Sequence, residues 1–148
     1  MIQYSWYNIK KPAFFNSITS WLELCVSQLF TSVNNVHYIF CDDNYILTIN
    51  REQLDHDYFT DIITFDYRED ESEPLECEIF VSIDTVRDNS FIYETSFQEE
   101  LMRVVVHGLL HMCGYNDSTD SEKSIMRTEE NKLISLYNSS TWNNNINE

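Results

Sequence analysis

Apolar side chains recur along this chain with two different periods, and the two periods separate predicted strands from predicted helices. Short stretches that alternate between apolar and polar residues, or that are apolar throughout, are typical of strands. Such stretches predict four strands, over residues 2–8, 36–41, 61–67 and 77–83. Residues 14–32 carry apolar side chains three and four positions apart, after Pro12, and this spacing predicts an amphipathic helix.

Two short helices are expected among the later strands. One begins at Asp42 or Asp43, either of which can act as its N-cap, and runs through Arg51. The other covers about 85–93, with Asp84 as its candidate N-cap.

A longer helix is expected next, because Ser96 and Glu99 form the capping-box pattern that starts helices. It runs to about Cys113 and is apolar on nearly all sides, which is typical of a central, buried helix. A last helix is expected over about 119–138. The asparagine-rich residues 138–148 predict a disordered tail.

Strands and helices in this order indicate an α+β fold, with a small mixed sheet of four strands and about five helices. Strands joined through a helix favour parallel pairing, so the sheet is expected to contain both parallel and antiparallel pairs. The chain has 148 residues, 43% of them hydrophobic, which is enough for one domain with one core. We place this single domain at 1–137.

The composition bears on location and on redox state. No apolar run is long enough to span a membrane, and the N-terminal residues lack the basic-then-apolar order of a signal peptide. We therefore expect a cytoplasmic protein without a membrane partner. The cysteines form no C-x-x-C pair and are expected to be reduced core residues. They are Cys25, Cys41, Cys77 and, inside the motif described next, Cys113.

The eleven residues HGLLHMCGYND, at 107–117, contain a candidate metal site. His107 and His111 are one helical turn apart, so both imidazoles project from the same face of a helix. The only two glycines of the protein fall in this window. Gly108 lies mid-helix, where glycine costs about 1 kcal/mol relative to alanine, so we expect substrate or another backbone to approach closely there. Gly114 permits a left-handed turn at the helix end.

That turn brings Asp117 toward the two imidazoles, although Asp117 can instead cap the next helix, in competition with Ser118 and Asp120. Three ligands, His107, His111 and Asp117, leave the fourth tetrahedral position to water, as in catalytic zinc sites. We expect one Zn²⁺ per chain, with another divalent ion as the alternative.

The position after the first histidine holds Gly108, where zinc proteases with this histidine spacing carry a glutamate that activates water. Peptide hydrolysis by that route is therefore disfavoured. A metal acting as Lewis acid remains, and it suits phosphodiester cleavage of RNA, whose own 2′-hydroxyl can attack. Arg103 lies one turn before His107 and can meet a substrate phosphate, or it can form a salt bridge with Glu99 or Glu100. His37 and His56 are expected to be ordinary residues.

The motif resembles the signature H-G-x-L-H-L-x-G-Y-D-H of the YbeY endoribonucleases, also called rRNA maturation factors. TDIITF at 60–65 is similar to the family's T-D-V-L-S-F, and EIFVS at 78–82 to its G-[DE]-I-x-I-S strand. An upstream N-R pair and a downstream M-x-x-x-E pattern match at Asn50, Arg51, Met126 and Glu130. The resemblance covers about residues 50–130.

The resemblance implies a metal-dependent endoribonuclease for single-stranded RNA, working in 3′-end maturation of small-subunit rRNA and in ribosome quality control. We expect His107, His111 and Arg103 to be the catalytic residues, and we expect a monomer. Four positions depart from the family pattern. Asp117 stands where the third ligand is usually histidine, Asn116 where aspartate is, Cys77 where glycine is, and Leu54 where the family often carries an arginine for RNA handling.

Net charge limits how such a protein meets RNA. The formal charge is −16. Residues 1–41 hold Lys10 and Lys11 against Glu23, a net of +1, so the remaining residues carry −17. Because phosphate neutralisation drives loose nucleic-acid binding, a chain of this sign is expected to act on RNA presented by the ribosome or by a basic ribosomal protein.

Two other functions stay open on the sequence. One is a metalloprotease-like hydrolase that takes its base from elsewhere, with Asp61 and Glu130 as candidates. The other is a ribosome-assembly factor that uses its metal for stability and has no catalytic activity.

Overall fold

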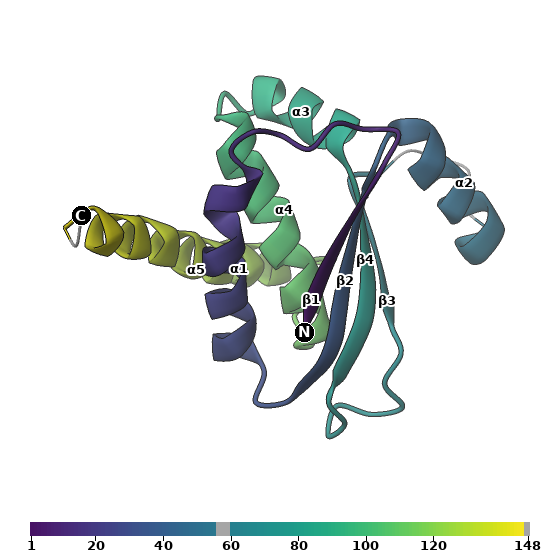
Figure 1. Cartoon of the computed structure of the whole chain (residues 1–148). Coiled ribbons are helices and arrows are strands. Elements are labelled where there is room, and N and C mark those ends of the chain that lie inside the picture. Colours follow the sequence, from purple (N-terminus) through teal and green to yellow (C-terminus); the bar gives the residue numbers. More distant parts are fainter. Residues whose placement is uncertain (56–59, 147–148) are drawn as a thin grey trace.

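The chain folds around one four-stranded sheet in the order β1-β2-β4-β3 (Figure 1). The computed structural model describes residues 1–55 and 60–146, with side chains described up to residue 137. Strand β1 (Ile2–Tyr7) pairs in parallel with β2 (Val33–Cys41), and β2 pairs in parallel with β4 (Leu75–Ser82). Strand β3 (Ile62–Asp66) is an edge strand and pairs antiparallel with β4. The expected mixed sheet is confirmed.

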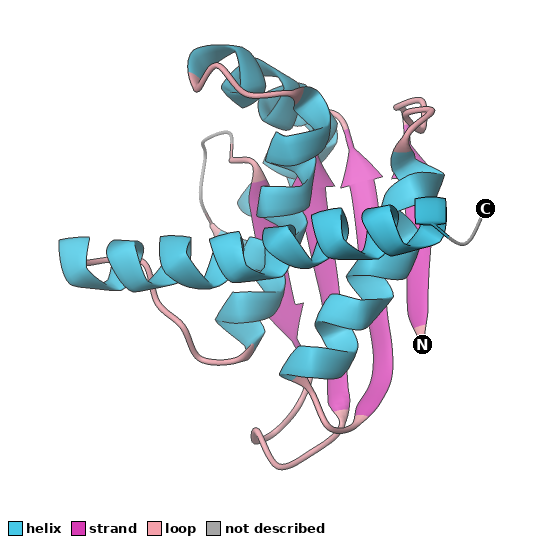
Figure 2. Ribbon diagram, turned by 90° about the vertical axis from the view of Figure 1, so that its left-hand side faces the viewer, coloured by secondary structure: helices cyan, strands magenta, loops and turns pink. Residues whose placement is uncertain are grey.

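Five helices belong to the described part of the chain, as the sequence predicts. They are α1 (Phe15–Leu29), α2 (Asp43–Leu54), α3 (Ile83–Ile92), α4 (Phe97–Met112) and α5 (Asp120–Ile146). Helices α1, α4 and α5 cover one face of the sheet, where α5 crosses the other two (Figure 2). Helix α2 packs on the opposite face, where Ile46 joins a smaller apolar cluster with Phe80. The α+β fold is confirmed, with one face of the sheet covered by helices and the other buried only where α2 packs.

The starts of α2 and α3 share one polar network. Asp42 caps α2 by accepting from the backbone N–H of Tyr45 at 2.8 Å. Helix α3 begins earlier than its sequence pattern indicates, and its N-cap is Ser82, so the prediction that Asp84 caps it was wrong. Asp84 instead accepts from the backbone N–H of Asp43 at 3.0 Å, which binds the start of α2 to that of α3.

Helix α4 is the central element of the fold. Ser96 caps it, because its hydroxyl accepts from the Glu99 N–H at 3.0 Å. The helix is buried on most sides, as its sequence predicts, with Leu101, Val105, Val106, Leu109 and Leu110 fully inaccessible to solvent. The residues that α4 carries are therefore held on a rigid support.

Gly108 explains how closely α4 lies against the sheet, and the explanation differs from the sequence expectation. A Cβ atom at this position would lie 2.9 Å from Cδ1 of Ile62 and 3.1 Å from Cγ2 of Ile79. Side chains of β3 and β4 thus fill the space beside Gly108, and neither substrate nor another backbone does. The glycine sets the distance between helix and sheet.

Helix α5 continues to Ile146, beyond the end at 138 that the sequence pattern predicts. The division into a domain at 1–137 and a disordered tail at 138–148 stays a prediction. Cys25, Cys41 and Cys77 are buried, Cys113 is partly buried, and all four are free thiols, as expected. Within the described residues, no helix is long and apolar enough to cross a membrane.

Candidate metal centre

The end of α4 turns the chain back toward its own histidines. Gly114 has φ +98°, and its N–H donates to the His111 carbonyl, while the Tyr115 N–H donates to the carbonyl of Leu110. These two bonds are those of a Schellman motif, which glycine forms without strain. The guanidinium of Arg68 donates to the Met112 carbonyl at 2.8 Å and fixes the same helix end to the β3–β4 connection.

The next helix has its own cap, which leaves Asp117 available. The hydroxyl of Thr119 accepts from the Glu122 N–H at 3.1 Å, and the Glu122 carboxylate accepts from the Thr119 N–H at 2.9 Å. This reciprocal pair is a capping box at the start of α5. The capping role considered for Asp117, Ser118 and Asp120 therefore belongs to Thr119.

Three side-chain atoms converge at the turn. His107 Nε2 and His111 Nε2 are 3.0 Å apart, and Asp117 Oδ2 lies 3.1 Å from the first and 3.7 Å from the second. A tetrahedral zinc ion with bonds of about 2.0–2.1 Å separates its ligand atoms by about 3.3 Å. The three atoms thus have the spacing and the chemistry of a metal-ligand set, and all are partly accessible to solvent.

The other nitrogen of each imidazole is engaged by the protein. His107 Nδ1 is 2.6 Å from Glu130 Oε2, and His111 Nδ1 is 3.0 Å from the carbonyl oxygen of Tyr115. Because an acceptor faces each Nδ1, the proton of each neutral ring belongs there, and each Nε2 lone pair points into the space that the two rings share with Asp117. Metal-binding histidines are commonly held this way, and the arrangement fits a metal ion.

Glu130 is a buried carboxylate, 5% exposed, between the guanidinium of Arg103 and the imidazole of His107. Arg103 donates to its Oε1 at 2.9 Å, and His107 contacts its Oε2. Burial favours a raised pKa for Glu130, but the hydrogen bonds from His107 and Arg103 outweigh burial and lower that pKa. Burial likewise acts to lower the pKa of His107, and Glu130, helped by Asp117 and Asp61, reverses the effect and raises it.

Arg103 reaches different partners from those that the sequence suggests. Its guanidinium binds Glu130 at 2.9 Å and the side-chain oxygen of Asn131 at 3.0 Å, both on α5. The salt bridge to Glu99 or Glu100 was therefore wrong. Both partners lie more than 25 positions away along the chain, beyond the reach of a helical spacing argument.

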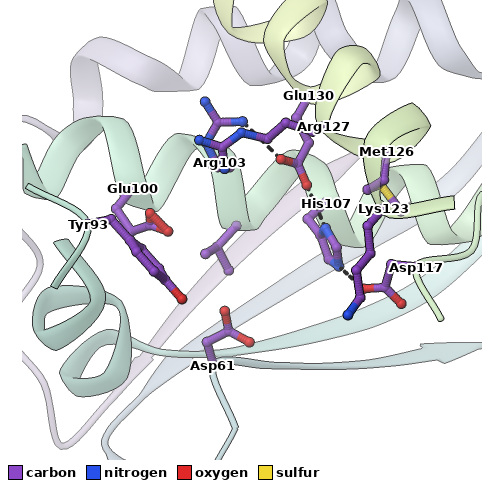
Figure 3. A pocket seen from close by; sticks show the side chains of 11 residues that line it. Asp61, Tyr93, Glu100, Arg103, His107, Asp117, Lys123, Met126, Arg127 and Glu130 are labelled. Atoms are coloured by element: carbon purple, nitrogen blue, oxygen red, sulfur yellow. Dashed lines mark hydrogen bonds and ion pairs between the residues drawn. The ribbon is translucent and has the colours of Figure 1, made fainter. Parts of the chain in front are cut away.

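A cleft of about 380 Å³ opens beside His107 (Figure 3). Its size lies in the range of ligand pockets, roughly 300–1,000 Å³. Burial raises the pKa of the Asp61 carboxyl on its floor, and burial also raises that of Glu100. The cleft is lined by Asp61, Tyr93, Glu100, Arg103, Val104, His107, Asp117, Lys123, Met126, Arg127 and Glu130.

Sequence reasoning found His107, His111, Arg103 and Asp117, and the structure brings all four to this region. It missed Tyr93, Lys123 and Arg127 in the cleft wall. The spacing of Lys123, Arg127 and Asn131 on α5 is a signal that could have found the two cations, since positions four apart share a helix face. His37 contacts Ser5 on the sheet, and His56 lies outside the described residues.

Fold and site together define an α+β protein with a His-His-Asp cluster able to hold a metal ion. The family model described as Endoribonuclease YbeY matches residues 2–138, and the chain belongs to that family. Membership supports an endoribonuclease role, in the class of hydrolases that act on RNA.

Relatives in the family match most of the chain. The Endoribonuclease YbeY of Phocaeicola vulgatus is 42% identical over 92% of this chain and 98% of its own. That of Cytophaga hutchinsonii is 46% identical over 88% of both chains. The solution structure of TM1509 from Thermotoga maritima superposes with a TM-score of 0.70 at 27% identity, covering 98% of this chain and 93% of the other.

Proposed function

We propose that the chain is a metal-dependent endoribonuclease for single-stranded RNA, acting in 3′-end maturation of small-subunit rRNA and in ribosome quality control. It works in the cytoplasm as a monomer and meets its RNA on the ribosome or on ribosomal proteins. His107, His111 and Asp117 hold one zinc or other divalent ion. The observation that carries the proposal is the convergence of their Nε2 and Oδ2 atoms within 3.0–3.7 Å, beside an open cleft.

When bound, the ion supplies Lewis acidity and activates water. The chain's own residues position the reaction. Glu130 keeps the Nδ1 proton on His107, and Arg103, which borders the same cleft, provides a positive charge for a substrate phosphate. Asp117 adds a negative charge to the ligand set, which makes the site more favourable for a harder ion than a third histidine would.

The contacts of Glu130 reduce the candidate bases of a protease-like hydrolase from two to one. A general base must be free to take a proton from water. Glu130 is engaged by both His107 and Arg103, so it is poorly placed for that task. Of the two candidates, Asp61 is the one that faces the cleft without an ion pair among the described residues.

Metal analysis of the purified protein tests the proposal. The parent should hold close to one zinc or other divalent ion per chain, and Asp117→Ala, His107→Ala and His111→Ala should lose it together with cleavage of a single-stranded RNA. Asp120→Ala, at an exposed position three residues on, should keep both. Removal of the ion with a chelator should stop cleavage, and the return of the ion should restore it.

Three results would contradict the proposal, and each points elsewhere. A parent that cuts a peptide and leaves RNA intact would indicate the protease-like hydrolase. A parent whose melting temperature falls on metal removal, without turnover of any substrate, would indicate the non-catalytic assembly factor. Full metal content in Asp117→Ala would remove Asp117 from the ligand set.

A further inference from the structure

Four carboxylates line the cleft, and the cleft also holds a third of the protein's Lys and Arg residues. The chain has nine Lys and Arg residues against twenty-five Asp and Glu, yet Arg103, Lys123 and Arg127 all line this one cleft. Arg103 is bound to Glu130, whereas the side chains of Lys123 and Arg127 form no ion pair or hydrogen bond within the described residues. Both are exposed and lie one turn apart on α5. Two cationic side chains that have no close ion pair among the described residues therefore face the space beside His107.

The opposite side of the cleft carries an exposed aromatic ring. Tyr93 is 65% exposed and points into the cleft from the end of α3 (Figure 3). Its backbone is fixed by a Schellman-type turn, in which the N–H of Thr95 donates to Ser90 and that of Glu94 donates to Phe91. Glu94 takes the left-handed conformation that this turn requires. The ring is thus presented from a defined turn.

Both signs of charge line the cleft. Glu100 lies beside Tyr93, whereas Lys123 and Arg127 belong to α5, and the positive charge of Arg127 also acts on the Glu100 carboxylate (Figure 3). A phosphate is repelled by Glu100 and attracted by the two cations. A nucleobase carries no net charge for Glu100 to repel, and the Tyr93 ring offers it a stacking surface.

We propose that this cleft binds one nucleotide of single-stranded RNA next to the metal ligands, with its base stacked on Tyr93 and its phosphate held by Lys123 and Arg127. The inference rests on the proposed function and adds a structural reason why the enzyme would prefer single-stranded RNA. Bases inside a duplex are already stacked and paired, so only an unpaired base can reach Tyr93. Tyr93 is then a residue that selects single strands.

Binding of a fluorescently labelled, 2′-O-methylated single strand to the metal-loaded protein tests the role of Tyr93. Methylation removes the nucleophilic hydroxyl, and a gel confirms that the strand stays intact. Tyr93→Ala should bind roughly 5- to 100-fold more weakly, the range for one aromatic–base stack. Tyr93→Phe should restore binding. Phe91→Ala, a neighbouring exposed aromatic position outside the cleft, should bind like the parent.

Salt dependence tests the two cations. In Lys123→Gln and in Arg127→Gln, the slope of log affinity against log salt concentration should become less negative by about 0.7 each, the value for one phosphate contact on a single strand. Lys132→Gln removes an exposed charge from α5 outside the cleft and should leave the slope unchanged. A strand containing the fluorescent base 2-aminopurine reports stacking directly. Its fluorescence should be quenched when the base stacks on Tyr93, and the complex with Tyr93→Ala should remain bright.

Failure of this inference differs from failure of the proposed function. If the parent cleaves RNA but Tyr93→Ala binds as tightly as Phe91→Ala, with unchanged quenching, the stacking site is overturned and the nuclease stands. If Lys123→Gln and Arg127→Gln have the slope of Lys132→Gln, the phosphate contacts are overturned. A parent that neither binds nor cleaves single-stranded RNA overturns both.

Discussion

Each imidazole of the metal centre depends on one acceptor, and the two acceptors differ in kind. His111 is oriented by a backbone carbonyl, that of Tyr115, which no substitution of a side chain removes. His107 is oriented by the carboxylate of Glu130, whose other oxygen is held by Arg103. The position of His107 therefore rests on a side chain of another helix, and it can be tested by changing that side chain alone.

Glu130→Gln should weaken metal binding while leaving the three ligands in place. The amide keeps the shape of the carboxylate, but it removes the negative charge that makes His107 a stronger ligand and that neutralises Arg103. Partners of this kind typically contribute 10- to 100-fold to metal affinity. Titration against a competing chelator measures the change, and Glu129→Gln, one residue away on α5, is the control. Equal affinity in parent and Glu130→Gln would show that the contact does not support the ligand.

The residues of the site differ in how far the sequence alone predicts them. The cluster of His107, His111 and Asp117 follows from one helical turn and one glycine turn, both local features of the chain. The pairing of Arg103 with Glu130 joins two helices across the core, and no local spacing encodes it. Thr119 was missed as a cap because Ser118 and Asp120 beside it are equally good capping residues.

At the scale of elements, the packing of α4 on the sheet is set by a single missing methyl group. Gly108 faces Ile62 on β3 and Ile79 on β4, and any side chain there must move one of them. The end of the Ile62 side chain can shift more easily than the fully buried Ile79. The helix that carries both histidines is thereby held close to the strand that follows Asp61.

Gly108→Ala should lower the free energy of unfolding by about 1 kcal/mol, because overpacking of roughly 1–3 kcal/mol exceeds the gain in helix propensity of about 1 kcal/mol. Ile62→Val removes the Cδ1 atom that the new Cβ would meet at 2.9 Å. In that background Gly108→Ala should cost less or become stabilising. Urea unfolding of the parent, the two single variants and the double variant measures the coupling between the two positions. Strictly additive effects would mean that Ile62 does not limit the position.

The elements themselves follow largely from periodicity, whereas their arrangement does not. All four strands and all five helices are present near their predicted places, because each has a run of residues long enough to show its period. The insertion of β4 between β2 and β3, and the location of α2 on the far face, depend on which apolar surfaces meet. Such contacts join distant parts of the chain and leave no mark in any one window.

On the scale of the whole molecule, the charge of −16 opposes the approach of a polyanion, although the cleft offers Lys123 and Arg127, which have no close ion pair among the described residues. Screening limits the range of this repulsion to about 8 Å at physiological ionic strength, so the local cations act only after RNA has come close. A basic protein surface beside the RNA would turn the long-range repulsion into attraction, because surfaces of opposite potential steer association.

Cleavage of the same rRNA should therefore be slower after its proteins are removed than in the assembled small-subunit particle. Electrostatic steering commonly changes association rates by about 10- to 1,000-fold, so we expect at least about a 10-fold difference at physiological salt. The difference between the two cleavage rates should become smaller as salt is raised. Screening weakens both the repulsion between the protein and free RNA and its attraction to the particle. Initial rates on particles and on deproteinised RNA, measured across salt concentrations, make the comparison. Equal rates at every salt concentration would mean that the acidic surface plays no part in choosing the substrate.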